Sequence, residues 1–155
     1  MLATSYTLTA TTDLPFAASV ERVRDELKIE GFGVLCEIDV QATLREKLGV
    51  EEEPYLILGA CNPPLAHQAL GAEPDLGTLL PCNVVVYRRD NQTHISAIDA
   101  ERMLSIVGND DLTSIAAEVR AKLATVVERA GNPSNHIVAG SLRMLGDAVR
   151  SPLPR

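Results

Sequence analysis

An almost wholly apolar run at residues 55–61 (YLILGAC) limits the fold more than any other feature of the sequence. A short apolar run bounded by turn residues is typical of a strand at the centre of a sheet. The run is too short to cross a bilayer, and the chain has no stretch of eighteen apolar residues. The sequence therefore predicts a globular domain built around a central strand, with no membrane partner.

Four other segments have the alternation or composition of strands, namely 4–11, 32–39, 82–88 and 93–98. In the second of these segments, Phe32, Val34, Cys36 and Ile38 are expected to share one face. Cys36 is therefore expected to pack in the core. Glu37 and Asp39 share the other face, where they form either an acid–base pair or part of a solvated surface, and Asp39 can also cap a following helix.

Apolar residues at helical spacing predict two long helices. The first has Phe16, Val20, Val23 and Leu27 on one face, is capped by Asp13 and ends at Gly31. The second is capped by Asp110 or Asp111 and buries Leu112, Ile115, Val119, Leu123 and Val126. Shorter helices are expected at 41–48 and from Pro63 to about Leu70, and Asn62 can cap the second of these, whose first two positions are prolines. Residues 71–80 are expected to form a loop.

The dipeptide Asp90-Asn91 suits a two-residue hairpin turn between the last two strands. This turn sets the register, so that Tyr87 faces His94 and, further along, Cys82 faces Asp99. Directly opposed residues share a sheet face.

The predicted order is β-α-β-(α)-β-(α)-β-β-α, which indicates an α+β layer fold of about five strands and two long helices. A length of 155 residues fits one domain, which we assign to residues 1–131. Residues 132–155 form a separate tail, in which Val138, Leu142, Leu145 and Val149 predict a short amphipathic helix.

Charge and cysteine content narrow the classes of function. The chain carries 14 basic and 21 acidic residues, a net charge of −7, and such a surface repels nucleic-acid phosphates. The N-terminus lacks the basic and apolar regions of a secretory signal, and the three cysteines cannot all pair within one chain. We therefore expect a cytoplasmic protein with reduced thiols and no nucleic-acid partner.

Three motifs together resemble one prokaryotic family. They are Gly59-Ala60-Cys61-Asn62-Pro63, Leu80-Pro81-Cys82-Asn83-Val84, and Gly31-Phe32-Gly33-Val34 running on to Asp39. The set is similar to the domain-of-unknown-function 302 family over roughly residues 5–130, and the tail lies outside the similarity. The resemblance implies a TATA-box-binding-protein-like fold, in which helices pack on one face of a curved, mainly antiparallel sheet. It also implies a homodimer, and it implies no particular reaction.

An antiparallel sheet would place Cys61 and Cys82 at the same end. We therefore name a candidate ligand-binding site made of Cys61, Asn62, Cys82, Asn83, Asp39 and Asp99. The two thiols either line this site or only fill space in the core. No metal site is expected because paired local ligands are absent, and no motif for a nucleotide cofactor occurs.

Three hypotheses about function remain open. In the first, a cytoplasmic homodimer binds a small molecule or handles sulfur species at the Cys61–Cys82 site. In the second, Cys61 is the nucleophile or redox centre of a thiol enzyme, because it precedes a helix N-terminus that can lower a thiol pKa. In the third, the protein is a non-catalytic interaction module with structural cysteines. The sequence does not decide whether the protein is an enzyme.

Overall fold

One six-stranded sheet organises the part of the chain that the computed structural model describes, residues 1–132. Its strands are β1 (Leu2–Ala3), β2 (Thr7–Thr12), β3 (Gly33–Asp39), β4 (Tyr55–Cys61), β5 (Cys82–Arg89) and β6 (Gln92–Ile98). Their order is β1-β2-β6-β5-β4-β3, and every neighbouring pair is antiparallel. The predicted α+β class and antiparallel sheet are confirmed, with β1 as an added edge strand. The predicted tail helix lies outside the described residues.

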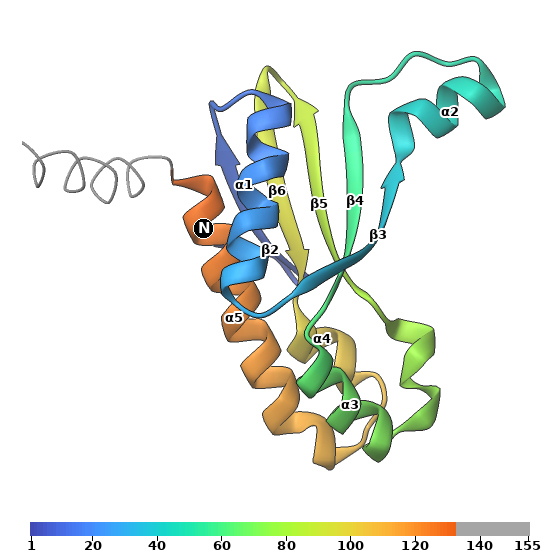
Figure 1. Cartoon of the computed structure of the whole chain (residues 1–155), viewed down its shortest axis with the longest axis vertical. Coiled ribbons are helices and arrows are strands. Elements are labelled where there is room, and N and C mark those ends of the chain that lie inside the picture. Colours follow the sequence, from blue (N-terminus) through green and yellow to red (C-terminus); the bar gives the residue numbers. More distant parts are fainter. Residues whose placement is uncertain (133–155) are drawn as a thin grey trace, which may run out of the picture.

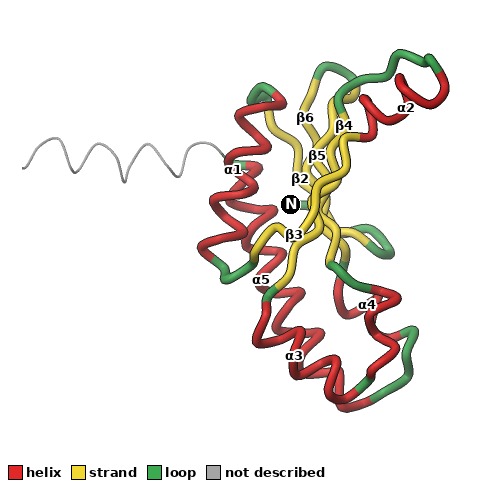
Figure 2. The backbone as a smooth tube through the Cα atoms, turned by 45° about the vertical axis from the view of Figure 1, so that its right-hand side comes forward, coloured by secondary structure: helices red, strands yellow, loops and turns green. Residues whose placement is uncertain are grey.

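Most of the helices occupy one face and one end of the sheet. The α-helices are α1 (Phe16–Ile29), α2 (Val40–Leu48), α3 (Pro63–Ala72), α4 (Ala100–Ser105) and α5 (Thr113–Gly131). Helices α1 and α5 cover the same face of the sheet, while α3 and α4 lie together beyond one end of it (Figure 1). Helix α2 stands apart at the other end, on the side of the sheet opposite α1 and α5 (Figure 2).

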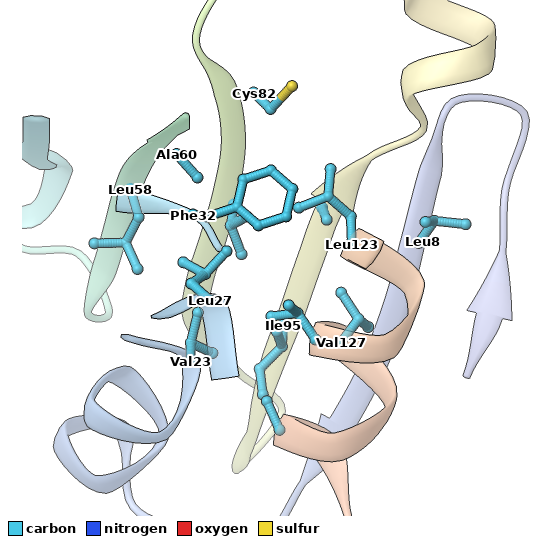
Figure 3. Packing of buried hydrophobic residues seen from close by; sticks show 14 of the residues in the cluster. Leu8, Val23, Leu27, Phe32, Leu58, Ala60, Cys82, Ile95, Leu123 and Val127 are labelled. Carbon is cyan, nitrogen blue, oxygen red and sulfur yellow. The ribbon is translucent and has the colours of Figure 1, made fainter. Parts of the chain in front are cut away.

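The main core fills the space between the sheet and helices α1 and α5 (Figure 3). Leu58 and Ala60 of the central strand point into it, as do Leu27 of α1 and Leu123 of α5, and all four are almost completely buried. Since successive strand residues face opposite sides, their neighbours Ile57 and Gly59 point to the uncovered side of the sheet. We call that uncovered side the open face.

The hairpin between β5 and β6 has the predicted turn. Asp90 and Asn91 have φ values of 50° and 61°, as a two-residue turn with left-handed central residues requires. The pairing runs from Arg89–Gln92 through Tyr87–His94 to Val84–Ala97, so the predicted register is confirmed over these residues.

Two of the predicted helix caps are present and two are not. The side chains of Asn62 and Asp39 accept hydrogen bonds from the first turns of α3 and α2. Asp13 does not cap α1, which begins after Pro15 with no side-chain cap. Neither Asp110 nor Asp111 caps α5, because a 3₁₀ turn at Asp110–Leu112, capped by Asn109, precedes that helix.

The expectation that Cys36 packs in the core is wrong. A register irregularity separates the pairs Val34–Ala60 and Cys36–Gly59, so Leu35 is an extra residue in β3. One inserted residue moves all later side chains to the opposite face. Val34 therefore packs against the core, whereas Cys36 and Ile38 lie on the open face and are exposed.

Two further elements differ from the prediction. Residues 71–80 contain a 3₁₀ helix, Pro74–Leu79, in place of a plain loop. Helix α4 was not predicted, because its six residues are too few to show a helical period. These two segments matter because they help to enclose the cavity described next.

Candidate functional site

A cavity of about 330 Å³ lies between the end of the sheet and helices α3, α4 and α5. We call it the end pocket. Almost all its wall is apolar, and its lining includes Phe32, Leu35, Cys61, Asn62, Leu65, Ala66, Leu80, Cys82, Met103 and Ile115. A site of this size and polarity is typical of pockets that hold small, largely apolar molecules.

Cys61 and Cys82 both line the end pocket, as the antiparallel sheet requires. Ala60 pairs with Cys82, so the two thiols come from adjacent strands at the same end. Burial raises the pKa of Cys82 to about 11, and the nearby Cys61 adds to the effect. The Cys82 thiol therefore stays protonated at neutral pH, which does not suit a nucleophile.

Asn62 lies in the wall of the pocket, but its amide is already engaged. Its Oδ1 accepts a hydrogen bond of 3.4 Å from the Leu65 N–H, and its Nδ2 donates over 3.5 Å to the Glu30 carbonyl. The capping amide thus takes up an N–H that a Cys61 thiolate would need at the helix N-terminus. The Asn62 side chain therefore contributes mainly to the shape of the pocket, because its amide makes its hydrogen bonds within the fold.

The other three candidate residues do not line the end pocket. Asn83 follows Cys82 along β5 and is exposed on the opposite side of the sheet. Asp39 ends β3 beside Leu56, at the far end of the sheet from Cys61, where it caps α2. The structure thus brings together Cys61, Asn62 and Cys82 and separates them from Asn83 and Asp39.

Asp99 is buried close to the end pocket, but its carboxylate is used in the fold. Oδ1 accepts hydrogen bonds from the Glu101 and Arg102 N–H groups, and Oδ2 accepts one of 2.9 Å from Arg120. The carboxylate therefore holds the start of α4 against α5. It contributes to the end pocket by fixing one of its walls.

The carboxylates of Glu37 and Asp39 have separate partners. Glu37 forms an ion pair with Arg24 of α1, and this hydrogen-bonded pairing lowers the pKa of Glu37. A carboxyl group that ionises this readily is not a general acid at neutral pH. Glu37 therefore belongs to a solvated surface, and Asp39 serves as a helix cap.

A second hollow, of about 810 Å³, runs along the open face. We call it the open-face trough. Its floor includes Val85 and Ser96, and its sides carry residues of α2 and of the N-terminal segment. Across it Tyr87 stacks between Tyr55 and His94, with ring centroids 5.2 and 4.8 Å apart. The hairpin register predicted the Tyr87–His94 neighbours, but no sequence signal placed Tyr55 beside them.

Several residues of the end pocket were not identified from the sequence. Leu65 and Ala66 come from α3, Leu80 from the segment before β5, and Met103 from α4. The only available signal was the apolar composition of α3. A helix this short has too few turns for its sequence to show which side faces a pocket.

Two general features of the described residues bear on function. Within residues 1–132, no group of three or more His, Cys, Asp and Glu side chains is arranged to hold a metal ion. Over the same residues, no helix combines the length and the apolar character needed to cross a bilayer.

Comparison with known proteins identifies the family. A model of the family described as "Domain of unknown function DUF302" matches residues 7–130. This chain belongs to the DUF302 family. The match includes all the strands of the sheet except β1, and α1 to α4 in full, so it covers the whole lining of the end pocket and all of the open-face trough except its N-terminal residues.

A solved DUF302 structure has the same fold. The crystal structure of an uncharacterized conserved DUF302 protein from Bacillus stearothermophilus shares 32% identity with this chain, with a TM-score of 0.76. The similarity covers 80% of this chain and 97% of the other. No curated protein matches. Membership of the DUF302 family thus defines the fold and leaves the activity to be argued from the site.

The environment of Cys82 predicts its reactivity. In the folded chain we expect Cys82 to be alkylated more slowly than Cys36 and Cys61, and about a hundredfold or more slowly than the same thiol in the unfolded chain at pH 8. Timed labelling with iodoacetamide, followed by peptide mass mapping, measures all three rates. Labelling in denaturant is the control and should make the three rates similar. Fast labelling of native Cys82 would contradict the assigned burial.

Proposed function

We propose that this DUF302 protein is a cytoplasmic homodimer that binds a small, uncharged and largely apolar molecule in the end pocket. The observation that supports this proposal is the pocket itself, an apolar cavity of about 330 Å³ at the end of the sheet. Burial of an apolar ligand there is favourable by about 25 cal/mol for each Å² removed from water.

The polar groups at the pocket favour an uncharged ligand. Asn62 already serves as a helix cap, and Asp99 already pairs with Arg120. A charged ligand would therefore lose its hydration without gaining a partner, which is costly in an apolar site. The two thiols add soft, weakly polar surface that tolerates an aromatic or aliphatic group.

Thiol chemistry is supported less well than binding. The raised pKa of Cys82 keeps that thiol protonated, and the Asn62 amide occupies an N–H at the start of α3. We therefore assign Cys61 and Cys82 to the wall of a binding site. A Cys61 nucleophile would need a depressed pKa, which an alkylation profile against pH would reveal.

Homodimer formation is the second part of the proposal. Within residues 1–132 no long helix covers the open face. Its side chains Tyr55, Ile57, Val85 and Tyr87 therefore remain partly exposed. A sheet face with this much apolar surface is commonly buried against another layer. The expected result is a solution mass twice that of one chain.

Binding can be tested with the neutral fluorescent probe N-phenyl-1-naphthylamine. We expect saturable fluorescence enhancement with one probe bound per chain. Ala66 is half-buried in α3 and lines the pocket, so Ala66→Phe should fill part of the cavity and weaken binding at least about tenfold, or 1.4 kcal/mol.

Gln68→Phe is the matched control, because Gln68 is exposed on the same helix and does not line the pocket. It should bind the probe like the unsubstituted protein. Circular dichroism melting of both variants checks that α3 is intact. The proposal is wrong if the unsubstituted protein shows no saturable binding, or if Ala66→Phe binds as well as Gln68→Phe.

A further inference from the structure

Three side chains that contain sulfur line the end pocket. The thiols of Cys61 and Cys82 and the thioether of Met103 come from β4, β5 and α4. They are far apart in the sequence, so no pattern of paired local ligands marks them. The set also differs from a group of three His, Cys, Asp or Glu side chains, none of which is arranged to hold a metal within residues 1–132. The three sulfur atoms are therefore a separate set of donors, created by the fold.

Strand pairing brings the two thiols close together. Ala60 lies opposite Cys82, so Cys61, the next residue of β4, is a diagonal neighbour of Cys82. The two sulfur atoms are near enough that Cys61 contributes to the raised pKa of Cys82. Figure 3 shows Cys82 at the margin of the main core, where β5 begins. Two sulfur donors from adjacent strands can therefore contact one ion in the pocket.

Helix α4 brings the thioether to the same end of the sheet. Val84 pairs with Ala97, and β6 ends one residue later at Ile98, so the chain turns into α4 at the level where β5 begins. Met103 lies one helical turn further on, and its N–H donates to the Asp99 carbonyl over 2.9 Å. A methionine side chain is long and unbranched, so its sulfur atom can adapt its position to a ligand.

The rest of the pocket wall favours a soft cation. None of the described residues that line it is charged, and none is a histidine. Structural zinc sites normally use four nitrogen, oxygen or sulfur ligands, which this wall does not offer. Thiolate and thioether sulfur are the soft ligands that select Cu(I). A monovalent ion that replaces one thiol proton leaves the charge of the pocket unchanged, so the apolar wall does not oppose it.

The first turn of α3 does not stabilise a bare thiolate at Cys61. Pro63 and Pro64 begin the helix and have no N–H, and the next N–H, of Leu65, donates to the Asn62 side chain. A thiolate in such surroundings is costly unless a positive charge lies beside it. A metal cation bound directly to the sulfur atom supplies that charge.

We infer that Cys61 and Cys82 together bind one soft monovalent metal ion, Cu(I), in the end pocket, with the Met103 thioether as a third donor. As the copper–sulfur bonds form, at least one thiol releases its proton to the solvent, and copper keeps its oxidation state. The inference concerns the same pocket as the proposed function, but it does not depend on the binding of an apolar molecule there.

Anaerobic titration with Cu(I) tests the inference, with bicinchoninate as the competing coloured chelator. Cys36→Ser is the reference protein, because the exposed Cys36 thiol could bind copper on its own. We expect the reference to bind one Cu(I) per chain. In this background, Cys61→Ser and Cys82→Ala should each raise the dissociation constant at least about a hundredfold, since loss of a residue that only supports a ligand already costs about 10–100-fold.

Two further variants separate this site from adventitious binding by a free thiol. The double variant Cys61→Ser with Cys82→Ala keeps only the thiol of Cys36 and should bind Cu(I) far more weakly than the reference. Met103→Leu removes one sulfur atom with little change in volume. In the reference background it should raise the dissociation constant by about threefold to tenfold, because a thioether is a weaker donor than a thiolate.

Two measurements accompany the titrations. Circular dichroism melting checks that each variant is folded, and Cys61→Ser is expected to fold because Cys61 is only half-buried. X-ray absorption at the copper edge should show only sulfur neighbours in the copper-loaded reference protein.

The outcomes separate this inference from the proposed function. The metal site is overturned if the reference does not take Cu(I) from bicinchoninate, if copper has nitrogen or oxygen neighbours, or if folded Cys61→Ser binds as tightly as the reference. Unchanged affinity in Met103→Leu overturns the role of the thioether. Binding of the neutral probe is measured without copper, so failure of either measurement leaves the other proposal standing.

Discussion

Replacing Asp99 with alanine is expected to lower the free energy of unfolding by about 2–3 kcal/mol, since the change removes a helix cap and an ion pair together. The Asp99 side chain is 7% exposed, accepts two N–H groups of α4 and lies 2.9 Å from the Arg120 Nε. Arg120 keeps a longer contact with Glu101, of 3.4 Å, which limits the loss. Urea denaturation followed by circular dichroism measures the change.

Two comparisons separate the contributions of Asp99. Asp99→Asn keeps an oxygen for the cap but loses the charge, so it should cost less than alanine. Asp39→Ala removes the exposed cap of α2 and should cost about 0.5–1 kcal/mol. An Asp99→Ala variant as stable as Asp39→Ala would contradict the structural role and reopen a role for Asp99 in binding. Because Asp99 anchors one wall of the end pocket, the same variant should also bind the neutral probe more weakly.

Gly59→Ala is expected to destabilise the protein by about 1–3 kcal/mol through overpacking. A methyl group at Gly59 would lie 2.5 Å from the Cys36 Sγ and 2.8 Å from the Pro81 Cγ. The cysteine side chain can rotate away, whereas the proline ring is rigid, so some of the crowding persists. Thermal and urea unfolding should both show the loss.

A double substitution distinguishes crowding from other causes. Cys36→Ala combined with Gly59→Ala should recover part of the lost stability, a non-additive result expected for residues in contact. Gly33→Ala is the control, because nothing lies within 4 Å of a methyl group there. If Gly59→Ala is as stable as Gly33→Ala, the close approach of β3 to Gly59 is not a constraint. This pair also gives Cys36 a role as the side chain that faces a glycine across the strands.

Local sequence signals were sufficient for the centre of the sheet. The apolar run at 55–61 is the central strand β4, and the Asp90-Asn91 turn fixes the register of the next two strands. Both signals are local: one depends on composition, the other on two residues that accept positive φ. Antiparallel pairing then brings Cys61 and Cys82 together, which was expected from the family resemblance.

Two rules of strand geometry, applied to the sequence alone, could have excluded part of the candidate site. Cys82 and Asn83 are consecutive strand residues and must face opposite sides of the sheet. Asp39 and Cys61 each end one of two antiparallel neighbours, so they lie at opposite ends. Applying these two rules would have reduced the site to Cys61, Asn62 and Cys82 with Asp99 nearby.

Other features depend on tertiary contacts that no local pattern contains. The extra residue at Leu35 reverses the faces of Cys36 and Ile38, and nothing in the alternation of 32–39 marks it. The hairpin register predicts that Asp99 faces Cys82. The chain instead leaves the sheet after Ile98 and turns into α4. The end pocket forms where three segments that are distant in the sequence pack together, namely α3, the segment before β5, and α4.

The irregularity in β3 also bears on how these molecules meet one another. An outer strand with a regular row of free N–H and C=O groups invites lateral addition of further strands, which leads to fibrils. Here the inserted Leu35 interrupts that row, and Glu37 of the same strand carries a charge. At the opposite margin, β1 offers only two residues. Sideways growth by the addition of further strands is therefore discouraged at both margins of the sheet.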